Sequence, residues 1–268
     1  MKYLESALKF LIKNWILAVP LFVLVALAAL LGRTFTAAAS LRSLWLAYGN
    51  IGQLSSPGNI FPFLQTILPV AAGGGILTFI FNFIAIPATY GLVNKSLDTG
   101  HAGLNDIGSA ISGNFAKYVM YILGVIVVSV ALGLASFIIL LVMVLITAAF
   151  KPFIIVTIII AIALTVAIII IMLLLSLWLP AMIVDGLDLA AAAKKSVEIV
   201  RSCFLMVLGI TLLVGIGCGI AGSIIGWLGL IPFLGKIITS IVPAAQSFIM
   251  ITFLLIVYRE RTGRTNCL

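Results

Sequence analysis

The sequence predicts an all-α integral membrane protein with six transmembrane helices. Of its 268 residues, 64% are hydrophobic and 8% are charged, whereas soluble domains carry about 25% charged residues. Six apolar stretches are long enough for the roughly 20 residues that a spanning helix needs. The Lys and Arg residues fall between these stretches. No soluble fold of this size could bury so much apolar surface, so residues 1–268 are expected to form a single transmembrane domain.

The expected spanning helices cover residues 15–31, 63–90, 117–149, 153–180, 203–226 and 236–258. An even number of spans places both termini on one side of the membrane. Four of the 15 basic residues fall on the opposite side (Arg33, Arg42, Lys151 and Lys236), so 11 share the side of the termini. All seven acidic residues also lie there. The positive-inside rule then predicts cytoplasmic termini in the plasma (inner) membrane.

The N-terminal region offers a second interpretation, a cleavable signal. The small residues 36–40 follow the first apolar stretch and could serve as a cleavage site. The leading segment is long, contains Glu5 and has the pattern of an amphipathic helix, which disfavours cleavage.

Pro-Phe occurs three times, beginning at Pro62, Pro152 and Pro232. Each pair stands where the second, fourth or sixth span is expected to begin, and proline is well tolerated in the first turn of a helix. The alternative is coincidence, since phenylalanine is common here. Amphipathic segments precede the odd-numbered spans, at 5–15, 104–115 and 189–204. We therefore expect three units, each a cytoplasmic amphipathic helix followed by a membrane hairpin.

The net charge of +8 does not indicate nucleic-acid binding, because the basic residues are dispersed between apolar runs. In a membrane protein such residues set orientation and attract anionic lipid headgroups. The predicted lipid-interface residues lie on the first and third amphipathic segments. They are Lys9, Lys13, Lys194, Lys195 and Arg201. The alternative is that the apolar faces of these segments pack on one another beneath the bundle.

The interior of the spans carries small residues but no ionisable ones at mid-membrane, which argues against a proton- or ion-coupled carrier. Gly215, Gly219, Gly222 and Gly226 share one face of the fifth span. Small residues allow helices to approach closely in a membrane, so this face is predicted to pack on a neighbouring helix. A substrate groove is the alternative.

Two spans contain residues that interrupt a helix. The second holds Pro69 and the run Gly73, Gly74 and Gly75, and the sixth holds Pro243. Interrupted helices in corresponding positions indicate a binding site in transporters. Asn82 and Gln246 would be its polar members, while a kink that serves packing alone is the alternative.

The sequence shows no sign of an enzyme or a cofactor site. Cys203, Cys218 and Cys267 form no Cys-x-x-Cys pair, and the single histidine, His101, completes no metal-ligand set. We find no nucleophile–base pair or phosphate-binding loop pattern, so we expect a protein without catalytic activity, cofactor or metal.

Residues 179–204 resemble a recurring segment of small prokaryotic polytopic membrane proteins. These proteins are related to the membrane domain fused to some glycerophosphodiester phosphodiesterases. The matching residues are Pro180, Val184, Asp185, Lys195, Ser196, Arg201 and Phe204. The chain departs from the pattern at Val197, Ser202 and Cys203. The phosphodiesterase catalytic domain is missing, so the resemblance implies the six-helix architecture and not the activity.

The function expected from these observations is that of a non-enzymatic scaffold or accessory factor for an envelope or transport system. Its expected partners are the lipid bilayer, anionic lipid headgroups and a second membrane protein, with no nucleic acid. The alternative is a permease or exporter of an apolar or lipid-like solute. A conduit lined by polar residues would favour the permease, and a closely packed core would favour the scaffold.

Overall fold

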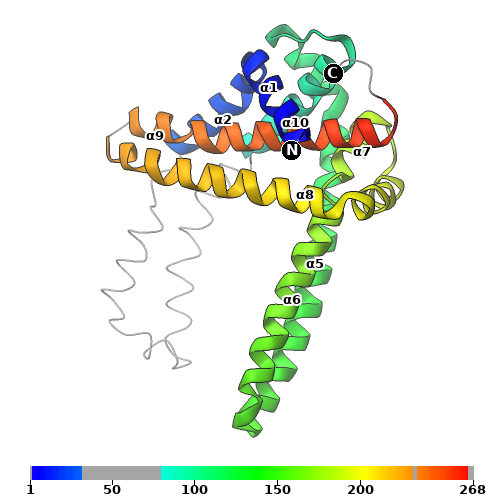
Figure 1. Ribbon diagram of the computed structural model, residues 1–268, viewed down its shortest axis with the longest axis vertical. Helices are drawn as coiled ribbons and strands as arrows, with labels where there is room; N and C mark the ends of the chain where they lie inside the picture. The colour runs from blue at the N-terminus through cyan, green and yellow to red at the C-terminus, as the bar shows by residue number, and fades with distance from the viewer. Residues whose placement is uncertain (1, 32–79, 232–233, 265–268) are drawn as a thin grey trace.

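The computed structural model describes residues 2–31, 80–231 and 234–264, and every regular element in these ranges is helical (Figure 1). Four helical stretches are long and apolar enough to cross a membrane, and a bent pair at the N-terminus makes a fifth if counted as one span. The four are Leu104–Thr147, Lys151–Val184, Leu189–Gly229 and Leu234–Arg261. Only residues 80–90 of the predicted span 63–90 lie inside the described ranges, so the six-span prediction stays a prediction.

The N-terminal segment consists of an amphipathic helix and an apolar helix at a right angle. Helix α1 (Lys2–Lys13) is followed by a 3-10 turn, η1 (Trp15–Ala18), and by α2 (Val19–Leu31). The two halves meet at an angle of 90°. Asn14 has a non-helical backbone, and its side chain donates a hydrogen bond to the Phe10 carbonyl at 3.2 Å. The chain therefore turns where the polar end of α1 meets the apolar run of α2.

The next described helix covers residues 80–99, so its end differs from the predicted boundary at residue 90. It continues through Pro87 and ends before Gly100, whose φ of 76° lies in the left-handed region that favours glycine. After η3 (Leu104–Asp106), helix α5 runs without interruption over Ile107–Ala149. The segment 104–115 is therefore not a separate amphipathic helix, because its glycines do not break α5.

Helices α5 and α6 (Ile154–Leu174) form an antiparallel hairpin that projects from the rest of the chain (Figure 1). Their connection, η4 (Lys151–Phe153), has Pro152 in its first turn as the Pro-Phe pattern predicts. Pro62 and Pro232 lie outside the described residues. The 43 residues of α5 extend for about 65 Å at 1.5 Å per residue, about twice the thickness of a hydrocarbon core.

The predicted fourth span, 153–180, is divided in two. Helix α6 ends at Leu174, three residues of turn follow, and α7 (Trp178–Val184) continues the apolar stretch Lys151–Val184. Pro180 lies in the first turn of α7, where a missing backbone N–H has little cost. The turn directs the chain from the projecting hairpin into the compact part of the protein.

The C-terminal part contains α8 (Leu189–Gly226), η5 (Trp227–Leu230), α9 (Leu234–Thr239) and α10 (Ile241–Arg261). The predicted boundary at residue 203 is a kink inside α8, where Cys203 has φ −134° and ψ 26°. Helices α8 and α10 run side by side and transverse to the α5–α6 hairpin (Figure 1), so these four helices do not form a parallel bundle.

Helix α10 is the centre of the hydrophobic core. Phe248, Phe253, Leu255 and Tyr258 are fully buried, and α10 contacts α1, α2, α7 and α8. The ring of Phe10 on α1 stacks on that of Phe248 at a centroid distance of 6.3 Å. The described chain therefore combines a closely packed part around α10 with a hairpin that stands apart from it.

Candidate functional site

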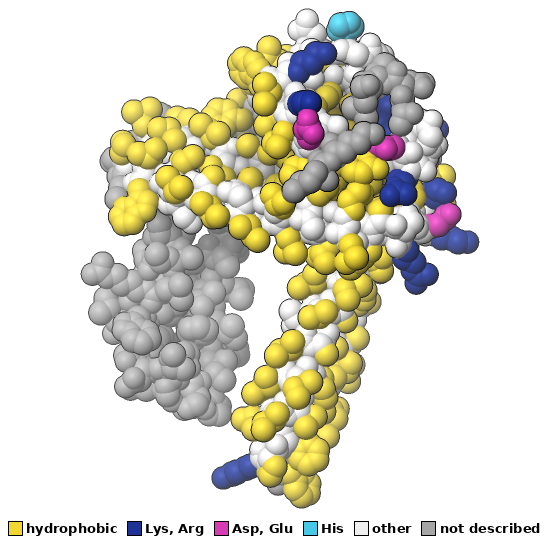
Figure 2. Space-filling model, viewed as in Figure 1, with side chains coloured by type: hydrophobic (Ala, Val, Ile, Leu, Met, Phe, Trp, Pro, Cys, Tyr) yellow, Lys and Arg dark blue, Asp and Glu magenta, His cyan; other side chains and the backbone are white. Residues whose placement is uncertain are grey.

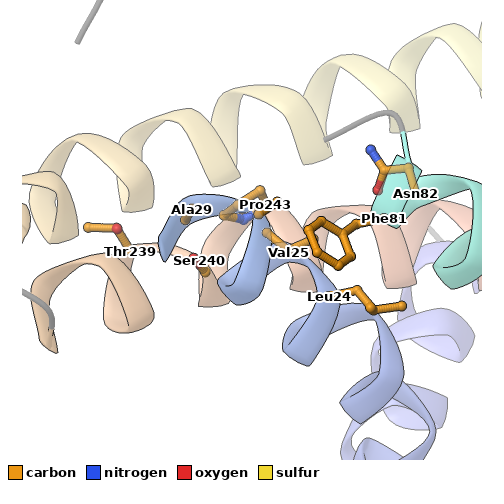
Figure 3. Close-up of a pocket in the computed structure, with 9 residues that line it drawn as sticks. Leu24, Val25, Ala29, Phe81, Asn82, Thr239, Ser240 and Pro243 are labelled. Atoms are coloured by element: carbon orange, nitrogen blue, oxygen red, sulfur yellow. The ribbon is translucent and has the colours of Figure 1, made fainter. Parts of the chain in front are cut away.

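A cavity of about 350 Å³ lies between α2, the beginning of helix 80–99 and the break between α9 and α10 (Figure 3). The wall is mainly apolar, and its polar members are Asn82, Thr239 and Ser240. The remaining lining residues are Leu24, Val25, Ala28, Ala29, Phe81 and Pro243. A cavity with these walls can accept an apolar group that carries one polar end.

Two residues of the predicted binding site meet at this cavity, Asn82 and Pro243. Gln246, on α10, is not among the lining residues. Pro69 and the run of three glycines at 73–75 lie outside the described residues. The break in the sixth span is at Ser240, whereas Pro243 occupies the first turn of α10. The prediction that interrupted helices form a binding site is not tested by these contacts and stays a prediction.

The polar side chains of the cavity differ in whether they form hydrogen bonds within the described chain. The hydroxyls of Ser240 and Thr239 donate hydrogen bonds to the Lys236 carbonyl, at 2.7 Å and 3.1 Å. The amide of Asn82 forms no hydrogen bond with any described residue. Asn82 is therefore the group best placed to bind a polar atom that enters the cavity.

The glycine face of α8 does not form the predicted close contact with the described helices. A Cβ atom built at Gly215, Gly219 or Gly226 would meet no described atom within 4 Å. Gly222 is the exception, because its Cβ would lie 3.7 Å from the Val242 side chain. The described residues therefore do not show close packing on this side of α8.

A polar network at the end of α10 was not predicted. Tyr258 donates a hydrogen bond to Asp185, and Arg264 pairs with the same carboxylate at 2.9 Å. Arg264 also donates to the Val184 carbonyl at 3.0 Å. These contacts connect the end of α7 to the end of α10. In the sequence, the only indication that Asp185 matters is that it belongs to the segment that carries the family resemblance.

Arg259 connects the same end of α10 to helix 80–99. The side chain is buried, and its Nη2 atom lies 2.6 Å from Asp98 Oδ1 and 2.9 Å from Asn94 Oδ1. The Nε atom has no hydrogen-bond partner. Arg259 looked like one of many interfacial cations in the sequence, and only the fold shows that it is an internal connector between two helices.

The predicted lipid-interface residues lie on the outer sides of α1 and α8. Lys9 pairs with Glu5 at 2.7 Å and Lys195 pairs with Glu198 at 3.4 Å. Lys13, Lys194 and Arg201 form no ion pair with any described residue. The apolar face of α1 packs on α10, and the first half of α8 packs on α7 and α10. Both segments therefore pack against the compact part through their apolar faces, and the predicted lipid-interface side chains lie on their exposed faces.

The described residues contain no group of three or more His, Cys, Asp or Glu side chains that could hold a metal ion. Comparison of the chain with protein-family models, with curated proteins and with solved structures finds no match. The described helices define an α-helical protein with several segments that are long and apolar enough to span a membrane. The particular activity must be argued from the surfaces and cavities of this chain.

Proposed function

We propose that this protein is a non-enzymatic scaffold or accessory factor for another membrane component of an envelope or transport system. The supporting observation is the α5–α6 hairpin. Its most apolar stretches have no residue buried by the described part of the chain, whereas 61% of the corresponding stretch of α10 is buried. Hydrophobic side chains cover the visible face of the hairpin along its length (Figure 2). The hairpin thus offers a long apolar surface that the protein's own core does not use.

The internal contacts of the hairpin keep this surface in a defined shape. The hydroxyls of Thr147 and Thr157 lie 2.6 Å apart near the connection of the two helices. Thr147 also bonds the Met143 carbonyl at 2.8 Å. A pair of helices fixed at both ends supports binding to another helix, because little order has to be gained on association.

Residue-specific photo-crosslinking in intact membranes tests the scaffold proposal. A photoreactive residue at Val130 or Leu134, both more than half exposed on α5, is expected to crosslink to one membrane protein. The same group at the buried Val207 should not crosslink. Gly133→Trp, at a position without described neighbours, should abolish the crosslink and leave the fold intact. Crosslinks to lipid alone at both exposed positions would exclude the scaffold function.

A second candidate function, a permease or exporter of an apolar or lipid-like solute, is supported by the cavity at Asn82. The test uses a fluorescent fatty acid as the probe. Ala28→Phe fills the cavity and should abolish probe binding, whereas Ala131→Phe on the exposed face of α5 should not. Equal binding by both variants would remove the cavity as the site of a carried solute.

We also propose that the protein lies in the plasma (inner) membrane with cytoplasmic termini, and that the basic half of α8 contacts anionic lipid. Each Lys or Arg near an anionic leaflet contributes about 1 kcal/mol. A spin label at Val197 should lie deeper in vesicles with anionic lipid than without it. Replacing Lys194, Lys195 and Arg201 with Gln should remove that difference. A label depth that is the same in all cases would exclude the lipid contact.

A further inference from the structure

A second cavity, of about 260 Å³, lies between α1 and the end of helix 80–99. Both helices contribute polar groups to it, so it is a site between two elements and not a feature of one helix. Its lining consists of Ser6, Lys9, Phe10, Lys13, Asn14, Ser96 and Gly100. None of these residues belongs to the cavity at Asn82 or to the polar network at the end of α10.

Ser96 is the most informative member of this site. Its residue is 4% exposed, yet its hydroxyl forms no hydrogen bond with any described residue. Among the described residues, the fully buried side-chain atoms without a partner belong to Ser176, Thr252 and Arg259, so the Ser96 oxygen stays reachable from the cavity. The hydroxyl lines the cavity, where it can donate to an acceptor that enters from outside. Ser6 on α1 likewise has no hydrogen bond within the described chain.

The charges at the cavity favour an anion. Lys9 and Lys13 each supply an ammonium group to the lining, which contains no carboxylate, and Glu5 on the same helix pairs with Lys9 from an exposed position. That pairing holds the pKa of Glu5 below its usual value. The carbonyl end of helix 80–99 contributes a partial charge of about −0.5, which opposes an anion. Two positive charges against one carboxylate and this partial charge leave the cavity net positive.

The surroundings of the two lysines indicate where the anion comes from. Leu8 and Ile12 on α1 and Trp15 at the start of η1 lie close to them in the chain and are exposed, Ile12 at 75% and Trp15 at 62%. Exposed apolar side chains next to lysines are typical of a helix that lies in the headgroup region of a bilayer. The right angle between α1 and α2 allows α1 to lie along the membrane surface while α2 enters it.

We propose that this cavity binds the phosphate group of an anionic phospholipid, with Lys9 and Lys13 as the charged ligands and Ser96 and Ser6 as hydroxyl donors. The exposed apolar residues of α1 contact the acyl region of the same lipid. The site fixes α1 at the inner interface and thereby fixes the angle at which α2 enters the membrane. It is independent of whether the protein acts as a scaffold or as a carrier.

The test measures the affinity of the full chain in detergent for phosphatidylglycerol by native mass spectrometry, with phosphatidylcholine as the zwitterionic comparison. Replacing both Lys9 and Lys13 with Gln should weaken phosphatidylglycerol binding by about tenfold or more, since hydrogen bonds to charged groups are lost. Ser96→Ala should weaken it by about threefold to tenfold. The matched control, Lys151 and Lys236 to Gln, removes the same charge at positions outside both proposed lipid contacts and should leave this binding within about twofold.

Ser96→Ala also separates binding from folding. Because this hydroxyl faces the cavity and makes no hydrogen bond to the described chain, its removal should leave the thermal stability of the lipid-free protein nearly unchanged. A loss of lipid affinity at unchanged stability is therefore the expected signature. Equal weakening by the Lys9/Lys13 and the Lys151/Lys236 variants would overturn the proposal, because it would show a general charge effect.

Inorganic phosphate added alone distinguishes a lipid headgroup from a free phosphate. We expect it not to displace phosphatidylglycerol at equal concentration, because it lacks the apolar contacts with Ile12 and Trp15. Displacement at equal concentration, lost in the Lys9/Lys13 variant, would overturn the lipid assignment.

Discussion

Ser196 is the residue whose replacement we expect to reveal most about the junction between the hairpin and the compact part. Its side chain is fully buried, and its hydroxyl donates to the Leu174 carbonyl at 2.7 Å and accepts from the Leu177 amide at 3.1 Å. These two backbone groups belong to the turn between α6 and α7. One hydroxyl on α8 therefore satisfies the end of another helix.

Ser196→Ala leaves the Leu177 amide without a partner and deprives the Leu174 carbonyl of one. An unsatisfied buried group costs about 1–3 kcal/mol, and hydrogen bonds in membrane proteins lie toward the lower part of that range. The Leu174 carbonyl loses the hydrogen bond from the Ser196 hydroxyl. We therefore expect the free energy of unfolding to fall by about 1–3 kcal/mol in total.

The assay is unfolding by titration with sodium dodecyl sulfate in mixed micelles, followed by circular dichroism. Ser223→Ala is the matched control, because Ser223 also bonds a backbone carbonyl, that of Gly219, but from an exposed position. We expect a change within about 0.5 kcal/mol for the control. If Ser196→Ala and Ser223→Ala have equal free energies of unfolding, the conclusion that Ser196 stabilises the α6–α7 turn is refuted.

The remaining predictions concern topology, packing and the Arg259 connection. A cysteine at Lys151 should react with an impermeant thiol reagent added outside cells, whereas one at Asp188 should not, and the reverse result would overturn the orientation. Gly124→Leu should lower the free energy of unfolding by more than the about 1–3 kcal/mol typical of overpacking, because its Cβ would lie 2.6 Å from the tryptophan ring of α7. Gly219→Leu lies at a position without described neighbours and should leave the midpoint of the same titration nearly unchanged. Arg259→Gln should lower the free energy of unfolding by about 1–3 kcal/mol, less than for a fully buried pair, because the side chain of its partner Asp98 is 53% exposed. An unchanged unfolding midpoint would contradict the role of Arg259 as a connector.

The helix boundaries show which features could be predicted from the sequence and which could not. The pattern predicted α1 because its apolar residues recur at helical spacing, and it predicted the α5–α6 connection at Pro152. The break at residues 175–177 was missed, because a run of apolar residues contains no local signal for a turn. That turn exists because Ser196, 19 residues beyond Leu177, satisfies its backbone groups.

The binding-site residues show the same limit. Asn82 and Pro243 were selected for their types and their positions in interrupted helices, and both line one cavity. Ser96 and Arg259 were not selected, since an ordinary serine and one cation among 15 carry no local signal. Their importance depends on burial and on partners contributed by segments far away in the chain.

The sequence by itself determined that this protein is helical and suited to a membrane, because hydropathy and helical periodicity are properties of neighbouring residues. Only the tertiary structure decided that α10 is the centre of the core, that α5 and α6 stand apart from it, and that polar side chains gather at the helix ends. Packing in a membrane follows from shape and from hydrogen bonds between distant segments, and apolar residues look alike whether they face lipid or another helix. For that reason the same composition yields a buried α10 and an exposed hairpin.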